Sequence, residues 1–316
     1  MVFTHYLITG GAGFIGSHVA RHLLEQGGRV TIVDNLSTGR QENIPEGARF
    51  IHLDLTDESF PADLDGKGID AIIHLAAQSS GEISFERPAY DLKTNTLGTL
   101  LLLRWSLENR IQKFVYSSSM SVYGDGPEWP VTEEGPINPK SFYGVGKMAS
   151  EHYINIFHDM GLDTTILRFF NVYGPGQNME NLKQGMVSIY MSYIAGGRPI
   201  LVKGALDRFR DLVYIDDVVR AIDLSLERRE SSGMTFNVCT GRKTSISQLL
   251  EMIMTSFGES RDYPLMLAPP TPRDQHGVFG SYERIRGVLD WSPAVSLEEG
   301  LTRMTSWVKE YYARKG

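Results

Sequence analysis

Short runs of β-branched and aliphatic residues alternate with longer stretches of helical periodicity through the first half of the chain. The strands predicted from these runs cover 5–11, 29–35, 48–55, 70–77 and 113–119. The longer stretches predict helices over 14–27 and from about 89 to 110. Strands that are apolar on both faces and separated by helices indicate a parallel sheet covered on both sides. Right-handed crossovers then produce a doubly wound α/β fold.

The pattern changes after residue 170, where Gly, Pro and Asn gather at 171–178. The elements predicted beyond it are helices over 185–195, 217–229, 245–258 and 297–314, and strands over 211–217 and 235–241. The last two strands resemble the sheet of the first half. We therefore expect a Rossmann domain from 1–170 plus about 211–241. A smaller α/β domain, interleaved with it, is expected from about 171–210 plus 242–316 and would bind the substrate.

Composition and charge argue against several classes of protein. The 316 residues carry 31 basic and 38 acidic side chains, a net charge of −7, which disfavours a nucleic-acid or membrane-surface partner. Cys239 is the single cysteine, so an intramolecular disulfide and a cysteine-cluster zinc site are excluded, and the histidines lack metal-ligand spacing. No apolar run approaches the roughly 18 residues of a membrane span. Because a strand begins by His5, we expect no signal peptide and a cytoplasmic location.

A glycine-rich turn stands between the first predicted strand and the first predicted helix. TGGAGFIG (9–16) places Gly10, Gly13 and Gly16 at three-residue spacing. Glycines in this context permit a tight turn and let a pyrophosphate approach the backbone at the helix N-terminus. Asp34 ends the second strand, where a carboxylate accepts hydrogen bonds from ribose hydroxyls and repels a 2′-phosphate. The turn and Asp34 together predict a dinucleotide site that favours NAD over NADP. Asp54 ends the third strand and is expected near the adenine.

Tyr143 and Lys147 lie four residues apart in YGVGK (143–147), so on a helix they share a face. A tyrosine that takes a proton near neutral pH needs a lowered pKa, which a neighbouring ammonium and a nicotinamide cation both favour. Ser119 closes the fifth predicted strand. Ligands bind beyond the carboxyl ends of such strands, so Ser119 is expected to hydrogen-bond a substrate oxygen beside Tyr143.

These motifs together resemble the extended short-chain dehydrogenase/reductases, with HLAA (74–77) and Leu55 among them. More narrowly, the chain resembles the NAD-dependent nucleotide-sugar epimerases of the UDP-glucose 4-epimerase type. The segments that carry the narrower resemblance are VDNLSTG (33–39), GTLLLL (98–103), LRFFNVYGPGQ (167–177) and RDLVYIDDV (210–218). The resemblance implies NAD contacts with Gly10, Gly13, Phe14, Ile15, Gly16, Asp34, Asn35, Asp54, Leu55, Leu75, Ala76, Ala77, Asn95, Ser117, Tyr143 and Lys147. It implies contacts with a nucleoside-diphosphate sugar, UDP being favoured, for Ser119, Ser121, Asn171, Gly185, Met186, Val187, Arg210 and Arg273.

By the same resemblance, Tyr143 takes the proton of the sugar 4-hydroxyl while hydride passes to NAD, and the 4-keto sugar turns over before hydride returns. Lys147 would lower the tyrosine pKa and hold the nicotinamide ribose. The resemblance also implies a homodimer.

Related reactions remain as alternatives. Dehydratases and decarboxylases of this type need a carboxylate at the positions of Met120 and Ser121, so both reactions are disfavoured. A nucleotide-4-keto-sugar reductase needs the same three groups as the epimerase. A UDP-glucuronate 4-epimerase would carry an arginine where this chain has Asn178, and a non-catalytic dinucleotide sensor usually loses the tyrosine or the lysine.

Two positions concern the substrate more closely. Arg273 either replaces the arginine that relatives carry at the position of Thr271, or is a solvated loop residue. Val278 stands where a tyrosine in some relatives excludes an acetamido group. A small residue there leaves room for both a hexose and its N-acetyl form.

Overall fold

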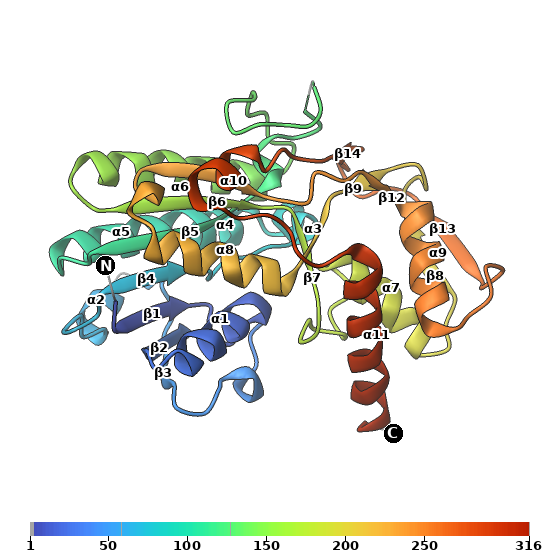
Figure 1. The fold of residues 1–316 in the computed structure, drawn as a ribbon, viewed down its shortest axis with the longest axis horizontal. Helices are drawn as coiled ribbons and strands as arrows, with labels where there is room; N and C mark the ends of the chain where they lie inside the picture. Colours follow the sequence, from blue (N-terminus) through green and yellow to red (C-terminus); the bar gives the residue numbers. More distant parts are fainter. Residues whose placement is uncertain (1–2, 58, 127, 316) are drawn as a thin grey trace.

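A computed structural model describes residues 3–57, 59–126 and 128–315, and a seven-stranded sheet lies at its centre (Figure 1). Neighbouring strands are parallel throughout, in the order β11–β6–β5–β4–β1–β2–β3. The strands are β1 (His5–Thr9), β2 (Arg29–Asp34), β3 (Arg49–His52), β4 (Ala71–His74), β5 (Lys113–Ser119), β6 (Thr164–Phe169) and β11 (Met234–Val238). The order reverses between β1 and β4, so the carboxyl ends of these two strands form the switch point at which ligands bind. The doubly wound fold predicted from the sequence is confirmed.

Helices cover both faces of the sheet. On one face α1 (Phe14–Glu25) packs against α8 (Ile215–Glu227), and on the other α5 (Gly98–Glu108) packs against α6 (Phe142–Asp159). Adjacent residues of one strand explain the two layers: Ile8 belongs to the core under α1 and α8, and Leu7 to the core under α5 and α6. Both are 0% exposed, which is why the strands show no polar alternation in the sequence.

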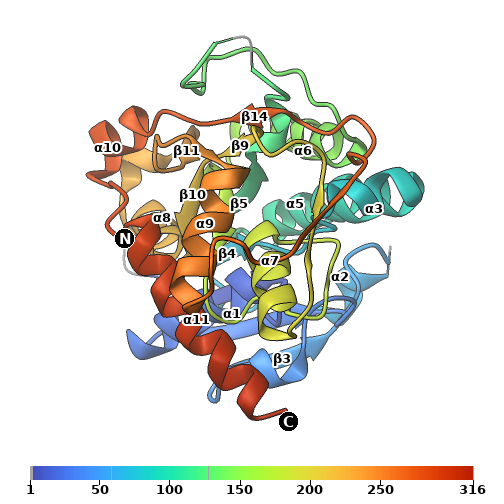
Figure 2. The ribbon, with the colours of Figure 1, turned by 90° about the vertical axis from the view of Figure 1, so that its right-hand side faces the viewer.

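Three helices pack together beside the sheet and form most of the remaining structure, at the right of Figure 1 and facing the viewer in Figure 2. They are α7 (Met186–Ala195), α9 (Ile246–Phe257) and α11 (Leu297–Ala313). Small sheets accompany them: β7 (Asn171–Tyr173) with β10 (Leu212–Tyr214), β8 (Ile200–Lys203) with β13 (Leu265–Ala268), and β9 (Phe209–Arg210) between β12 (Thr244–Ser245) and β14 (Gly277–Val278). The other helices are α2 (Phe60–Asp63), α3 (Gly81–Glu86), α4 (Pro88–Leu92) and α10 (Glu283–Leu289).

Several elements differ from the sequence prediction. The strand expected over 211–217 is only Leu212–Tyr214, and it pairs with β7 instead of joining the central sheet, whereas β11 does join it beside β6. The strand β6 was not predicted, although all six of its residues are buried. The helix expected from about 89 to 110 consists of α4, a π-helical turn at Lys93–Leu97 and α5. Such π turns inside helices often lie at functional sites.

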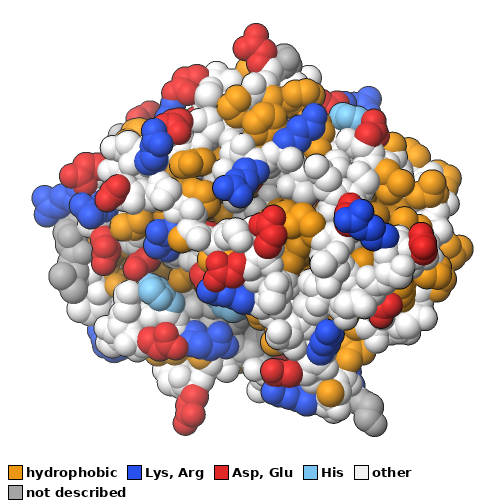
Figure 3. Space-filling model, turned by 45° about the vertical axis from the view of Figure 1, so that its right-hand side comes forward, with side chains coloured by type: hydrophobic (Ala, Val, Ile, Leu, Met, Phe, Trp, Pro, Cys, Tyr) orange, Lys and Arg blue, Asp and Glu red, His pale blue; other side chains and the backbone are white. Residues whose placement is uncertain are grey.

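Charges of both signs are mixed over the face shown in Figure 3, without an extended basic area. Within the described ranges, no helix is both long enough and apolar enough to cross a membrane. The same ranges contain no group of three or more His, Cys, Asp or Glu side chains arranged to hold a metal ion.

Candidate active site

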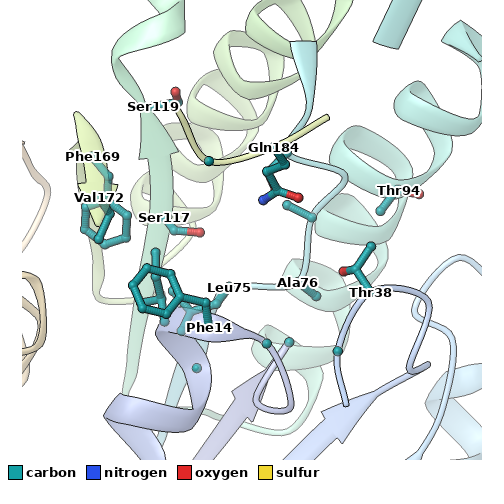
Figure 4. A pocket seen from close by; sticks show the side chains of 18 of the residues that line it. Phe14, Thr38, Leu75, Ala76, Thr94, Ser117, Ser119, Phe169, Val172 and Gln184 are labelled. Carbon is teal, nitrogen blue, oxygen red and sulfur yellow. The ribbon is translucent and has the colours of Figure 1, made fainter. Parts of the chain in front are cut away.

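A cavity of about 360 Å³ opens at the carboxyl ends of the central strands (Figure 4). Its wall combines the loops that follow β1 to β5 with residues of β7 and the start of α7. Of the residues predicted to form the site, those that line the cavity are Gly10, Gly13, Phe14, Ile15, Gly16, Asp34, Asn35, Asp54, Leu55, Leu75, Ala76, Ala77, Ser117, Ser119, Ser121, Tyr143, Lys147, Asn171, Gly185, Met186 and Val187. The fold therefore brings together residues up to 177 positions apart in the chain.

The glycine turn forms one end of the cavity. Gly10 has φ +70, and a Cβ placed on it would lie 2.7 Å from the backbone nitrogen of Ala76 at the end of β4. A Cβ on Gly16 would lie 2.2 Å from the carbonyl oxygen of Gly10. Helix α1 begins within this turn, at Phe14, and its N-cap Gly13 offers no side-chain cap. Because Gly13 to Gly16 line the cavity, the first turn of α1 can bind an anion there.

Polar residues at or just after the ends of β2 and β3 form another part of the wall. They are Asp34, Asn35 and Asp54. Asp34 is 8% exposed, and its two carboxylate oxygens accept hydrogen bonds from the backbone nitrogens of Ala12 at 3.0 Å and Leu36 at 2.8 Å. These bonds fix the carboxylate at the cavity wall and leave lone pairs for a ligand. Asn35 donates to Asp54 at 3.0 Å. This end of the cavity therefore offers acceptors that suit the hydroxyls of a ribose.

Tyr143 and Lys147 project from the first two turns of α6 toward the end of β5. Ser141 caps this helix, its Oγ accepting from the Gly144 nitrogen at 3.1 Å. The Lys147 side chain is buried, and its Nζ donates to the Ser117 carbonyl at 2.7 Å. The same Nζ lies 5.9 Å from the centre of the Tyr143 ring. The two strand-end serines and the helix pair thus form one cluster.

Burial shifts the pKa values of the pair in opposite directions. Desolvation raises the pKa of Tyr143 to about 12, although the neighbouring Ser119 hydroxyl favours the phenolate by hydrogen bonding. Desolvation lowers the pKa of Lys147 to about 7, against the opposing charges of Asp91 and Glu151. Both shifts disfavour charged forms, so a phenolate at Tyr143 requires a further positive charge beside it.

Three of the predicted residues do not line the cavity. Asn95 is buried behind its wall, where its side chain exchanges hydrogen bonds with the backbone of Gln78 and donates to Asp91. Arg210 is also buried, and it donates to the carbonyls of Phe209, Gln275 and His276. Arg273 is exposed in a loop, with φ 50.

Polar residues that the motifs did not single out also line the cavity. They are Ser37, Thr38, Thr56, Ser79, Thr94, Ser118, Gln177 and Gln184. Figure 4 shows the amide of Gln184 and the hydroxyl of Ser117 extending toward the same space. Ser37 and Thr38 come three and four residues after Asp34, so their place in the loop after a strand was a usable signal. Gln184 lies 65 residues beyond Ser119 in a loop without a local pattern, and only the tertiary fold brings it to the site, where it donates to Ser79.

Neighbours of the site bear on its chemistry. Met120 and Ser121 line the cavity and supply no carboxylate. Val278 is fully buried in a small cluster with Phe170, and Phe170 is the member of that cluster that reaches the cavity wall beside Met120. Val278 itself is outside the cavity wall, so a change at position 278 would affect the cavity through Phe170.

Known proteins are similar to this chain in sequence and in structure. Residues 6–239 match the family model described as the NAD dependent epimerase/dehydratase family. A UDP-glucose 4-epimerase of Mycolicibacterium smegmatis is 35% identical over 310 residues, which cover 96% of this chain and 98% of that protein. The crystal structure of a UDP-glucose 4-epimerase with UDP-glucose from Thermotoga maritima has a TM-score of 0.93 and 37% identity, covering 98% of this chain and 99% of its own.

A second solved structure extends the similarity to a cofactor complex. The UDP-glucose 4-epimerase of Thermus thermophilus, crystallised with NAD, has a TM-score of 0.90 and 33% identity, covering 97% of this chain and 99% of its own. The similarity spans the glycine turn, the sheet and the helical part that follows. The chain belongs to the NAD dependent epimerase/dehydratase family.

Proposed function

We propose that this protein is an NAD-dependent epimerase that inverts C4 of a UDP-hexose or UDP-N-acetylhexosamine. One observation carries the proposal: Ser119, Tyr143 and Lys147 stand on one cavity with the glycine turn and Asp34. The resemblance to UDP-glucose 4-epimerases over nearly the whole of both chains supports it.

The residues of the turn suit NAD. A side chain at Gly10 or Gly16 would meet backbone atoms at less than 3 Å, so the turn stays open to a pyrophosphate. The uncapped start of α1 and the carboxylate of Asp34 then supply donors for phosphate and acceptors for ribose. NAD held by the glycine turn and Asp34 would supply the hydride acceptor and donor for C4.

The protein's own groups handle the proton. Tyr143 takes the proton of the 4-hydroxyl as a phenolate and returns it at the end of the cycle. Because burial raises the pKa of Tyr143 to about 12, Tyr143 needs the Lys147 ammonium and a cationic nicotinamide to ionise near neutral pH. Ser119 hydrogen-bonds the 4-oxygen and keeps it beside Tyr143.

The charge of the cavity favours a neutral sugar. Within the described part of the chain, Lys147 is the one cationic side chain on the cavity wall, and it donates to the Ser117 carbonyl. Lys183 is outside the wall and pairs with Glu86. The carboxylate of a hexuronate would therefore find no cation on the wall apart from Lys147, which favours a sugar without that charge.

A reductase is the second candidate, because it uses the same three groups. Incubation with NAD and no reductant separates the two functions. UDP-glucose, UDP-N-acetylglucosamine and UDP-glucuronate are offered separately, and the products are followed by NMR. The proposal predicts C4-inverted product from the first two sugars without net NADH. If all three sugars stay unchanged and a 4-keto sugar is reduced with NADH or NADPH instead, the epimerase assignment is wrong.

The exposed surface of α6 supports a homodimer. Phe142, Val145, Ile156 and Met160 follow one stripe of this helix and its C-cap, and each is between 45% and 57% exposed. A second copy that packs this stripe against its own would remove it from water. Light scattering should then give twice the mass of 35.4 kDa, and Ile156→Glu should give a monomer. A cytoplasmic location is part of the same proposal.

A further inference from the structure

A buried ion pair lies one helical turn beyond Lys147. Arg168 of β6 donates to the two carboxylate oxygens of Glu151 on α6, from Nε at 2.9 Å and from Nη2 at 2.7 Å. Each residue is 4% exposed. A two-pronged guanidinium–carboxylate contact restrains orientation as well as distance. The pair therefore restrains how α6 sits on β6.

The same carboxylate also holds the strand that ends in Ser119. Ser118, the neighbour of Ser119, donates its hydroxyl hydrogen to Oε1 of Glu151. Glu151 follows Lys147 by four residues, so the two side chains share a face of α6. One carboxylate thus joins the helix that carries Tyr143 and Lys147 to the carboxyl ends of β5 and β6.

The guanidinium has further partners on the side away from the cavity. Nη1 of Arg168 donates to the Tyr123 hydroxyl at 2.8 Å and to the Glu133 carbonyl at 3.3 Å. Tyr123 in turn donates to Asn237 of β11 at 2.7 Å. Neither Glu151 nor Arg168 belongs to the cavity wall. Any effect of the pair on the reaction must therefore pass through the residues that it holds.

We propose that Glu151 and Arg168 are positioning residues of the reaction. The ion pair, together with the hydrogen bond from Ser118, fixes α6 on β5 and β6. It thereby keeps Tyr143 and Lys147 beside Ser119 and the Ser117 carbonyl. This inference rests on the proposed function for its kinetic part. A misplacement of about 1 Å in a catalytic arrangement lowers a rate by roughly 100-fold, which is the scale of effect that such a pair controls.

The opposite end of β5 offers a matched control. Lys113, at the start of β5, is buried and donates to Asp163 just before β6, at 2.9 Å, and to Ser231 at 2.9 Å. This ion pair also joins β5 to the chain that enters β6, but it lies at the amino ends of the strands, away from the cavity. Asp163→Asn and Glu151→Gln each remove one carboxylate charge from a buried cation.

The experiment compares these two variants, and Ser118→Ala as a milder one, in the NAD-loaded protein. We expect both amide variants to unfold at a lower temperature. Only Glu151→Gln should lower kcat, by about 10- to 100-fold, with KM within about twofold of the wild type. Ser118→Ala should lower kcat in the same direction by less. If Glu151→Gln does not fold, Arg168→Lys decides the kinetic question, because it keeps the charge outside the cavity wall and removes the two-pronged contact.

The pH dependence of kcat separates a specific effect on Lys147 from a general loss of stability. The charged and titratable groups that face Lys147 are Tyr143 and Glu151 on α6, Asp91 on α4, Tyr116 on β5 and His74 on β4. Removal of the Glu151 charge lowers the pKa of Lys147, so the descending limb of the kcat profile should move to lower pH. The limb should stay in place in Asp163→Asn. The proposal would be overturned if both amide variants lost kcat equally and the descending limb of the pH profile stayed at the wild-type pH in both.

Crystal structures give a readout that does not depend on turnover. The Lys147–Ser117 contact, 2.7 Å in the wild type, should persist in Asp163→Asn and be lost or lengthened in Glu151→Gln. An unchanged contact in Glu151→Gln contradicts the inference even if the protein turns over no UDP-sugar. A wild type without epimerase activity contradicts the proposed function alone.

Discussion

The ammonium of Lys147 lies 5.9 Å from the centre of the Tyr143 ring, with both groups on one face of α6. Burial drives both toward their neutral forms, with a pKa of about 7 for the lysine and about 12 for the tyrosine. At neutral pH Lys147 is therefore only partly protonated, and Tyr143 is a neutral phenol. A cationic nicotinamide held beside Tyr143 and Lys147 would supply further positive charge and would link proton transfer to occupation of the cofactor site.

Replacement of Tyr143 by Phe should lower turnover by orders of magnitude while NAD remains bound. The ring still fills its place on α6, and only the proton acceptor is removed. Loss of general base catalysis costs about 10²- to 10⁴-fold in rate. Turnover is followed by NMR, and bound NAD is measured after denaturation of the purified variant. Near-normal turnover would show that another group takes the proton.

Replacement of Lys147 by Met should stabilise the NAD-free protein at neutral and acidic pH. The folded state depresses the lysine pKa from 10.5 to about 7, so between these values the unfolded chain binds more protons. The stability of the wild type then rises with pH across this window. Below this pH window, the buried lysine lowers the free energy of unfolding of the wild type by about 5 kcal/mol at most.

The corresponding measurement is urea unfolding of both proteins from pH 6 to pH 10. The stability advantage of Lys147→Met should be largest at pH 6 and should shrink as pH rises. A pH-independent difference would mean that Lys147 keeps its ordinary pKa in the folded protein. Lys147→Met should also lose turnover, because it lacks the ammonium beside Tyr143. A charge that lowers stability is thus kept for activity.

Asp34→Ala should weaken NAD binding by at least about tenfold, since hydrogen bonds to a charged group contribute about 1.5–3 kcal/mol. The same carboxylate should make wild-type affinity for NADP much lower than for NAD. Calorimetry on NAD-free protein measures both dinucleotides. Equal wild-type affinity for NAD and NADP would remove the role assigned to Asp34.

Gly16→Ala should destabilise the fold by about 2–3 kcal/mol, because its Cβ would overlap the Gly10 carbonyl. Gly287 provides the matched control: it lies in α10, is exposed, and a Cβ there has no neighbour within 4 Å among the described residues. Gly287→Ala should stabilise α10 by up to about 1 kcal/mol. Denaturant unfolding gives the stability of both variants. If the two were equally destabilised, the backbone around Gly16 would have shifted to make room for the added Cβ.

Arg273→Ala should leave KM for the UDP-sugar within about twofold, because this side chain is exposed and belongs to a loop outside the cavity wall. Arg210→Ala should lower stability, since the guanidinium is buried on three backbone carbonyls, and should change UDP affinity little, because Arg210 is also outside the cavity wall. Titration with UDP and thermal unfolding separate the two effects. A large rise in KM for Arg273→Ala would place its side chain on the diphosphate.

The parts of the site that the sequence predicted are those that follow strand ends. Gly10, Asp34, Asp54 and Ser119 each stand at the end of a predicted strand, and parallel strands bring their carboxyl ends to one edge. The pair Tyr143 and Lys147 was predictable because helical spacing alone places two such residues on one face. These are local rules, and they need no knowledge of distant contacts.

Long-range packing decided the rest. The short strand at Leu212–Tyr214 follows an apolar pattern, yet it pairs with β7 outside the central sheet. Gln184 reaches the cavity through a loop without a local signal, and Arg210 turns to backbone carbonyls instead of the cavity. Glu151 joins Arg168 only because α6 crosses β6. By itself, the sequence determined a doubly wound parallel sheet with five of its strands in the first half of the chain, the glycine turn and the helical spacing of Tyr143 and Lys147, since each depends on neighbours in the chain. Only the tertiary structure decided which polar groups face the ligand, because burial and partners depend on segments far apart.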